Sequence, residues 1–193
     1  MLSSMKKFFP DKKEVPRQLI FDNIKIRQLR STDNELDYQA VIESGFRPEG
    51  FPKEVNLEQI SKHERDHNNK IEFAFTILDS NETVCLGCIF VKPISPFLKF
   101  AFFNDKICDH LELKENDPGI NFWITQSGWK QNLFGKILEK LIDWFKNDWP
   151  YENLFYLGME PSQKEIDEIE KISLKQKFLL QLENDKYYLW QLF

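Results

Sequence analysis

The hydrophobic pattern of residues 119–124 predicts a buried strand. Ile120, Phe122 and Ile124 alternate with the residues between them. A period of two places alternate side chains on opposite faces of an extended chain. We therefore expect a strand here, directly before a change of pattern.

A polar turn and a long amphipathic helix are expected after this strand. Gln126–Gly128 interrupts the alternation, and from Lys130 onward the apolar residues recur every three or four positions, as on one face of a helix. Pro150 cannot continue the helix, so we expect its end near Asp148. Unpaired N–H groups at the start of a helix carry partial positive charge and bind anions, above all phosphate. The unit is therefore either a phosphate site or an ordinary strand–helix connection.

The same two periods divide the rest of the chain. Strands are expected at residues 24–29, 72–78, 84–91 and 153–159, with a terminal hairpin at 178–182 and 187–192. Helices are expected from the capping residues 31–33 to Ser44 and at 57–67 after a cap at Asn56. A further helix is expected from Ser162, where Glu165 completes a capping box. Residues 1–17 are expected to form an N-terminal arm. Residues 18–193 are expected to form one domain, in which 97–118 is an insert between strands.

The composition is that of a globular protein. The 193 residues carry a formal net charge of −5, which gives no support for a nucleic-acid partner. No apolar run approaches the length of a membrane span, so we expect no membrane partner. The cysteines Cys85, Cys88 and Cys108 are odd in number, and we interpret them as reduced thiols of a cytoplasmic protein.

Residues 63–67, His-Glu-Arg-Asp-His, match the H-E-x-x-H pattern of zinc proteases. The intervening Arg65 and Asp66 are charged, whereas such a metal-binding helix is usually buried. No third ligand follows at a protease-like spacing. We therefore expect no metal site, and we interpret the motif as a solvated helix face.

Cys85 and Cys88 have the spacing of a redox or metal pair. Positions three apart in a regular strand point to opposite faces, so we expect the two thiols to diverge and to serve packing. The aromatic residues of 97–103, together with Trp123, are open to three interpretations. They line a substrate pocket, thicken the core, or form the contact of a homodimer.

The element order and several segments resemble the GNAT superfamily of N-acetyltransferases. The segments are DNELDYQAVIES at 33–44, FAFTILDSNETVCLGCIFVKPI at 73–94, FWITQS at 122–127 and LIDWFKNDWPYENLFY at 141–156. They are similar to a poorly characterised bacterial GNAT-like subgroup, and the resemblance covers residues 18–193. It implies an α/β (α+β) fold of the GNAT acyl-CoA N-acyltransferase type, with a mixed, mostly antiparallel sheet flanked by helices.

In this superfamily the strand–turn–helix unit binds acetyl-CoA, so the resemblance implies acetyl-CoA as co-substrate. The pantetheine arm lies along the strand, here at Ile124 and Thr125, and the pyrophosphate lies on a Gln/Arg-x-x-Gly-x-Gly/Ala turn. The matching residues are Lys130, Gln131, Asn132, Leu133, Phe134 and Gly135. Gly135 agrees with that pattern, and Lys130 occupies the Gln/Arg position. Leu133 replaces the first glycine, where a side chain is expected to crowd the backbone approach.

The resemblance also implies transfer of an acetyl group to an amine of a small molecule or a peptide. Such transfer needs a base for the amine proton and an acid for the leaving thiolate, frequently a Tyr of the fourth helix. No Tyr lies between Glu160 and Lys177, and the nearest candidates are Glu160 and Tyr156. Tyr38 and His63 are expected to border the acceptor. The alternative is a catalytically inactive GNAT-like domain that binds CoA or a protein partner.

Overall fold

A single mixed sheet organises the computed structural model, which describes residues 8–94, 116–159, 161–172, 177–182 and 185–193. Its strands are β1 (Gln18–Phe21), β2 (Ile24–Gln28), β3 (Phe73–Asp79), β4 (Cys85–Pro93), β5 (Pro118–Ile124), β6 (Phe155–Met159), β7 (Lys177–Leu182) and β8 (Asp185–Gln191). They are ordered β1-β2-β3-β4-β5-β6-β8-β7. All neighbouring strands are antiparallel except β5 and β6, which are parallel. The mixed, mostly antiparallel sheet expected from the sequence is confirmed.

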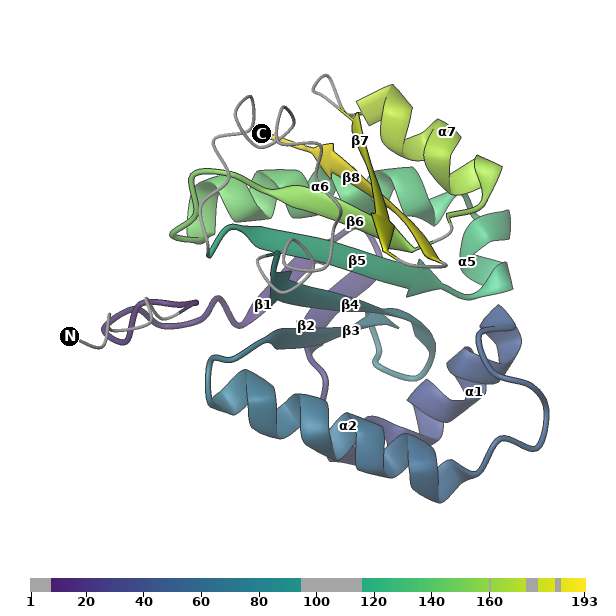
Figure 1. The fold of residues 1–193 in the computed structure, drawn as a ribbon. Helices are drawn as coiled ribbons and strands as arrows, with labels where there is room; N and C mark the ends of the chain where they lie inside the picture. The colour runs from purple at the N-terminus through teal and green to yellow at the C-terminus, as the bar shows by residue number, and fades with distance from the viewer. Residues whose placement is uncertain (1–7, 95–115, 160, 173–176, 183–184) are drawn as a thin grey trace.

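Helices cover both faces of this sheet (Figure 1). They are η1 (Ser31–Asp33), α1 (Asn34–Ser44), α2 (Lys53–Asn68), α5 (Gln126–Lys130), α6 (Leu133–Asp148) and α7 (Gln163–Ile172). Helices α1 and α2 lie on one face, and α6 and α7 lie on the other. Among the described residues, none of these helices is long and apolar enough to span a bilayer.

The core lies on both faces of β3. Phe73, Phe75 and Ile77 are buried in the cluster that includes the apolar face of α6. Ala74, which points to the other face, packs in a smaller cluster with Ile60 of α2. Because both faces are covered, the strand is apolar along most of its length rather than alternating. The buried residues of α6 include the five of the predicted apolar stripe, Phe134, Ile137, Leu138, Leu141 and Phe145, together with Leu133, Ile142 and Trp144.

The described part of the N-terminal arm packs against this core. Phe8 and Phe9 are buried, and their ring centroids lie 5.6 and 5.4 Å from that of Phe73. The Tyr151 hydroxyl donates a hydrogen bond of 3.2 Å to the Phe8 carbonyl oxygen. These contacts fix the arm beside β3. A strand that the sequence did not predict, β1, follows it and pairs with β2.

Several predicted boundaries are corrected by local geometry. Helix α2 begins at Lys53, with Pro52 as N-cap, so Asn56 is an interior residue and not a cap. The predicted turn at Gln126–Gly128 is the short helix α5, because the Thr125 hydroxyl accepts a hydrogen bond from the Gly128 N–H (3.1 Å). The predicted insert ends earlier than expected. Its last residue, Pro118, is the first residue of β5 and pairs with β4.

Other predicted boundaries are confirmed. Gly45 ends α1 in the left-handed conformation, with φ of 78°, where glycine pays no steric penalty. Ser162 and Glu165 form the predicted capping box of α7, since the Ser162 N–H donates to the Glu165 carboxylate (2.8 Å) and the Glu165 N–H donates to the Ser162 hydroxyl (3.3 Å).

Candidate active site

The parallel strands β5 and β6 separate after two paired residues. Gly119 pairs with Phe155 and Ile120 with Tyr156, and no further residues of these two described strands pair with each other. At the other edge of β5, the Thr125 N–H donates to the Leu86 carbonyl of β4 (2.9 Å). Alternate residues of a strand direct their backbone groups to the same edge.

This alternation decides which backbone groups face the gap between β5 and β6. Because Thr125 bonds to β4, the backbone groups of Phe122 and Ile124 point toward β6. The Tyr156 hydroxyl donates a long hydrogen bond of 3.5 Å to the Phe122 carbonyl oxygen. The remaining groups of Phe122 and Ile124 are in the position that can pair with an extended ligand.

Aromatic side chains form the wall of the gap on the α6 side. The Phe122 and Phe134 ring centroids are 4.5 Å apart, and Trp129 stacks on Phe134 at 4.7 Å. Tyr156 is 1% exposed, and burial raises its pKa above the ordinary value. Its phenol therefore stays protonated, and it already donates to a backbone carbonyl. Because the hydroxyl is buried and its proton is already engaged, a structural role is favoured over proton transfer for this candidate.

The helix α6 starts from a left-handed residue, Asn132, with φ of 54° and no side-chain hydrogen bond that caps the first turn. Asparagine tolerates this conformation better than most residues. Asn132 therefore has the backbone conformation that glycine adopts readily, at the position before Leu133. Leu133 is 7% exposed and belongs to the core, so its side chain turns away from solvent. The expected crowding of a cofactor by this side chain stays a prediction.

The other residues of this turn differ in exposure. Lys130, Gln131 and Asn132 are exposed, and Phe134 is buried. Gly135 is half-buried and faces α7, where a Cβ atom would lie 2.6 Å from a Glu168 carboxylate oxygen. The Ser127 N–H of α5 already donates to the Glu43 carboxylate (2.9 Å). The uncapped first turn of α6 is therefore a better anion site than α5.

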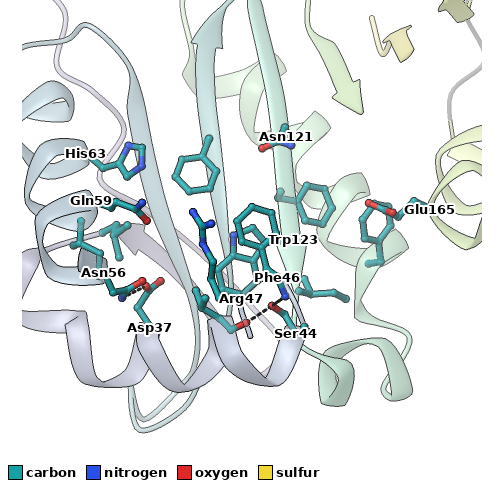
Figure 2. A pocket seen from close by; sticks show the side chains of 18 of the residues that line it. Asp37, Ser44, Phe46, Arg47, Asn56, Gln59, His63, Asn121, Trp123 and Glu165 are labelled. Atoms are coloured by element: carbon teal, nitrogen blue, oxygen red, sulfur yellow. Dashed lines mark hydrogen bonds between the residues drawn. The ribbon is translucent and has the colours of Figure 1, made fainter. Parts of the chain in front are cut away.

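A cavity of about 640 Å³ lies beside the gap and is lined from both layers of the fold. Helices α1 and α2 and the loop between them contribute Arg47, Asn56 and His63, the sheet contributes Trp123, and α7 contributes Glu165. Figure 2 shows these side chains around one open space. The cavity also touches Trp129, Phe134 and Tyr156. It therefore connects the gap with the face of the sheet that α1 and α2 cover.

His63 is held by a carboxylate in this cavity. Its Nδ1 lies 2.6 Å from Glu72 Oε1, and the other Glu72 oxygen lies 3.2 Å from Lys92 Nζ. Burial alone would raise the pKa of Glu72, but the hydrogen bond from His63 and the charge of Lys92 lower it to about 2. Glu72 is therefore a carboxylate at neutral pH, and it fixes the imidazole so that Nε2 remains for another partner.

Asp37, Cys85 and Cys88 form a buried cluster in the wall between α1 and β4. Their ligand atoms lie within 4.8 Å of one another, and this group could hold a metal ion. The Cys88 thiol donates to Asp37 Oδ1 (3.0 Å), and Asn56 donates to Asp37 Oδ2 (2.8 Å). Burial raises the pKa of Asp37. These hydrogen bonds account for the cluster without a ligand.

The prediction that the two thiols diverge is wrong. The pairing of β3 with β4 shifts between Ile77 and Leu78, because Leu78 pairs with Cys85 while Ile77 pairs with Gly87. The extra residue in β4 is a β-bulge, which returns Cys85 and Cys88 to the same face. At the bulge, a Cβ atom on Gly87 would lie 2.1 Å from the Trp123 carbonyl oxygen, so glycine is required there.

The residues of the H-E-x-x-H motif have separate partners. His63 bonds to Glu72, and Glu64 accepts a hydrogen bond from the Ser31 N–H (2.9 Å). His67 is 6% exposed and accepts a hydrogen bond from the Ala74 N–H. The motif is thus not the solvated face that we expected, because α2 packs His63 and His67 against the sheet.

The remaining predicted residues are placed as follows. The Tyr38 hydroxyl donates to the Phe51 carbonyl oxygen (2.9 Å), so it holds the loop between α1 and α2. Glu160 lies outside the described residues. Sequence reasoning missed Glu72 and Arg47. The signal for Glu72 was its place opposite Lys92 in the predicted hairpin. The signal for Arg47 was the presence of Phe46 before it and Phe51 four residues after it.

The fold is similar to those of solved acetyltransferases. A putative ribosomal-protein-serine acetyltransferase from Vibrio cholerae has a TM-score of 0.67 and 12% identity, over 95% of this chain and 98% of that one. Ribosomal-protein-S5-alanine acetyltransferase from Vibrio fischeri gives 0.64 and 11%, over 91% and 96%. A GNAT-family acetyltransferase from Bacillus anthracis gives 0.63 and 13%, over 90% and 96%. No family model and no curated protein matches the chain.

These similarities show that the chain has the GNAT acyltransferase fold, as its sequence predicted. At this level of identity they establish the architecture of the chain and not its reaction. The reaction depends on the residues of the site itself.

Burial of His67 makes the free energy of unfolding depend on pH. Burial lowers its pKa from 6.5 to about 4, so the unfolded chain binds more protons than the folded chain between these values. Stability is therefore expected to fall as the pH decreases from about 6.5 toward 4, by up to about 1.4 kcal/mol per pH unit. Urea unfolding between about pH 7 and pH 5 measures this slope. His67→Gln should lack this contribution, since glutamine accepts from Ala74 without titrating, and equal slopes would contradict the assignment.

Proposed function

We propose that the protein transfers an acetyl group from acetyl-CoA to an amine of a small molecule or a peptide. The observation that carries this proposal is the gap between β5 and β6, which opens into one cavity with His63. Acetyl-CoA supplies an activated acyl group as a thioester. The chain supplies binding groups on one side of the gap and a candidate base on the other.

The residues around the gap fit an acyl-CoA substrate. The backbone groups of Phe122 and Ile124 are available for the amides of an extended pantetheine arm. The uncapped N–H groups of α6 and the nearby Lys130 favour the negative charge of a pyrophosphate. Gln131 and Asn132 are exposed at this end of the helix, and they leave a phosphate free to approach.

His63 is the candidate general base of this proposal. An amine attacks a thioester carbonyl only when it is unprotonated, so a protonated amine must first lose a proton. The Glu72 carboxylate holds Nδ1 of His63 and leaves Nε2 as the acceptor for that proton. The amine nitrogen then bonds to the acetyl carbon, and the thiolate leaves with the electron pair of the C–S bond. The second proton, which the nitrogen loses as it becomes an amide, protonates the thiolate. Glu72, which touches His63, is a positioning residue.

Asn132→Asp tests whether the start of α6 binds the pyrophosphate. Aspartate also tolerates the left-handed conformation, and its charge favours a helix N-terminus by about 0.3–1 kcal/mol. Thermal stability should therefore not fall. Affinity for acetyl-CoA should nevertheless fall by about tenfold, because the new carboxylate repels phosphate. Calorimetry gives the affinity, and a melting curve gives the stability.

Two variants control this measurement. Asn132→Gly has no side chain and favours the same backbone conformation, so its affinity should equal or exceed that of the wild type. Asn147→Asp makes the same charge change at the exposed C-terminal end of α6 and should leave affinity unchanged. If Asn132→Asp binds acetyl-CoA as tightly as the wild type does, the pyrophosphate lies elsewhere.

His63→Gln should lower kcat by about 10²-fold or more, the range for a lost general base, with little effect on the KM for acetyl-CoA. Thiol release from acetyl-CoA, measured against a panel of amino acids and dipeptides, gives both constants. Glu72→Gln should lower kcat less, and Glu64→Gln, the same change on α2 outside the cavity, should leave it unchanged. A His63→Gln variant with the wild-type kcat would exclude this base.

A domain that binds CoA without turnover is the second candidate function. It is favoured by the state of the candidate acid Tyr156, which is 1% exposed and already donates its hydroxyl proton to the Phe122 carbonyl oxygen. This candidate predicts that acetyl-CoA binds while no amine in the panel releases the thiol.

A further inference from the structure

Among the described residues, Arg47 is the charged residue of the cavity with neither a hydrogen bond nor an ion pair. The charged side chains that line the cavity are Asp37, Arg47, His63, Lys92 and Glu165. His63 and Lys92 both contact Glu72. Asp37 accepts hydrogen bonds from Asn56 and Cys88. Glu165 accepts them from Ser162.

The Arg47 guanidinium is held in place by aromatic rings. Its central carbon lies 5.3 Å from the centroid of Phe46 and 4.9 Å from that of Phe51. Phe46 stacks on Trp123, with ring centroids 6.3 Å apart and planes 11° apart. The Tyr38 hydroxyl donates to the Phe51 carbonyl oxygen. These contacts give the loop between α1 and α2 a defined shape, with Arg47 directed into the cavity (Figure 2).

Within the described residues, Arg47 has no hydrogen bond and no ion pair. A half-buried guanidinium loses hydration, and aromatic rings satisfy its faces but not the N–H groups along its edge. Those N–H groups form a fork that matches the two oxygens of a carboxylate. An anion bound there would complete the hydrogen bonds of the guanidinium and pair with its charge.

We propose that Arg47 binds a carboxylate of the acceptor, so that the acceptor is an amine that also carries a carboxylate. This inference rests on the proposed function for the amine, since that amine must reach His63 in the same cavity. The carboxylate contacts the side chain of Arg47 while the amine faces the imidazole. Arg47 thereby determines specificity, and it takes no part in the movement of protons.

The volume of the cavity limits the size of the acceptor. About 640 Å³ lies within the range of small-molecule sites. The Trp123 and Phe46 rings form an apolar wall beside the guanidinium. An amino acid, or the first residue of a peptide with an acidic side chain, offers an amine and a carboxylate within such a space. An acceptor that carries an amine but no carboxylate leaves the Arg47 guanidinium without a hydrogen-bond partner, and an unpaired polar group costs binding free energy.

Matched ligand pairs test this proposal. The probes are amino acids against their carboxamides, and dipeptides that begin with aspartate against those that begin with asparagine. Wild-type protein should bind at least one carboxylate ligand about tenfold or more tightly than its neutral counterpart. Arg47→Gln should lose that preference, and Arg47→Lys should retain part of it, because lysine keeps the charge without the fork. Calorimetry measures binding directly, so the result does not depend on turnover.

Lys53→Gln is the matched control, because it removes the same charge from the start of α2. The Lys53 side chain pairs with Glu35 and does not line the cavity. The control should bind every probe as the wild type does. In kinetics, Arg47→Gln should raise the KM for the carboxylate acceptor and leave the KM for acetyl-CoA unchanged. Equal binding of charged and neutral probes by wild type would overturn the proposal, as would an Arg47→Gln variant whose defect is in acetyl-CoA binding. If the wild type prefers carboxylate probes but neither binds acetyl-CoA nor releases its thiol, the proposed function is wrong and the carboxylate site stands.

Discussion

The separation of β5 from β6 is the constraint on which the rest of the site depends. A buried backbone group without a hydrogen-bond partner costs free energy. Beyond Ile120, β5 therefore needs something other than β6 to pair with. Tyr156 supplies one donor, to the Phe122 carbonyl oxygen, and the Phe122–Phe134 stack lines the helix side of the gap. The remaining groups make β5 an edge within the sheet, and such an edge binds extended chains readily.

The charges of the cavity form two groups with different consequences. At one end, Lys92, Glu72 and His63 form a chain in which each charge has a partner, and the result is an oriented imidazole. At the other end, the Arg47 charge is held by aromatic rings alone among the described residues. A compensated chain suits the exchange of a proton, since no large charge has to be desolvated. An uncompensated cation suits the recognition of an anion.

Local signals in the sequence predicted most of the architecture. The Ser162–Glu165 capping box and the helix stop at Gly45 depend on residues within a few positions, so their patterns carried enough information. The resemblance of whole segments to GNAT proteins supplied the mixed, mostly antiparallel pairing of the sheet, which local patterns do not contain.

The errors came from contacts between distant segments and from single-residue shifts. One extra residue in β4 brought Cys85 and Cys88 together, and no alternation pattern shows such a bulge. The left-handed residue before α6, Asn132, was not predicted, because the turn motif has no glycine at that position. Glu72 and Arg47 became visible only once the sheet and the loop between α1 and α2 had placed them in the same cavity as His63.

Amide hydrogen exchange with and without acetyl-CoA tests the central claim most directly, because it reports on individual backbone groups. If the gap binds the pantetheine arm and α6 binds the pyrophosphate, acetyl-CoA should slow exchange at Phe122, Ile124 and residues 133–135. The amides of β2 and β3, which are already paired, should change little. Saturating acetyl-CoA that leaves exchange at the gap and at the start of α6 unaltered would contradict the account.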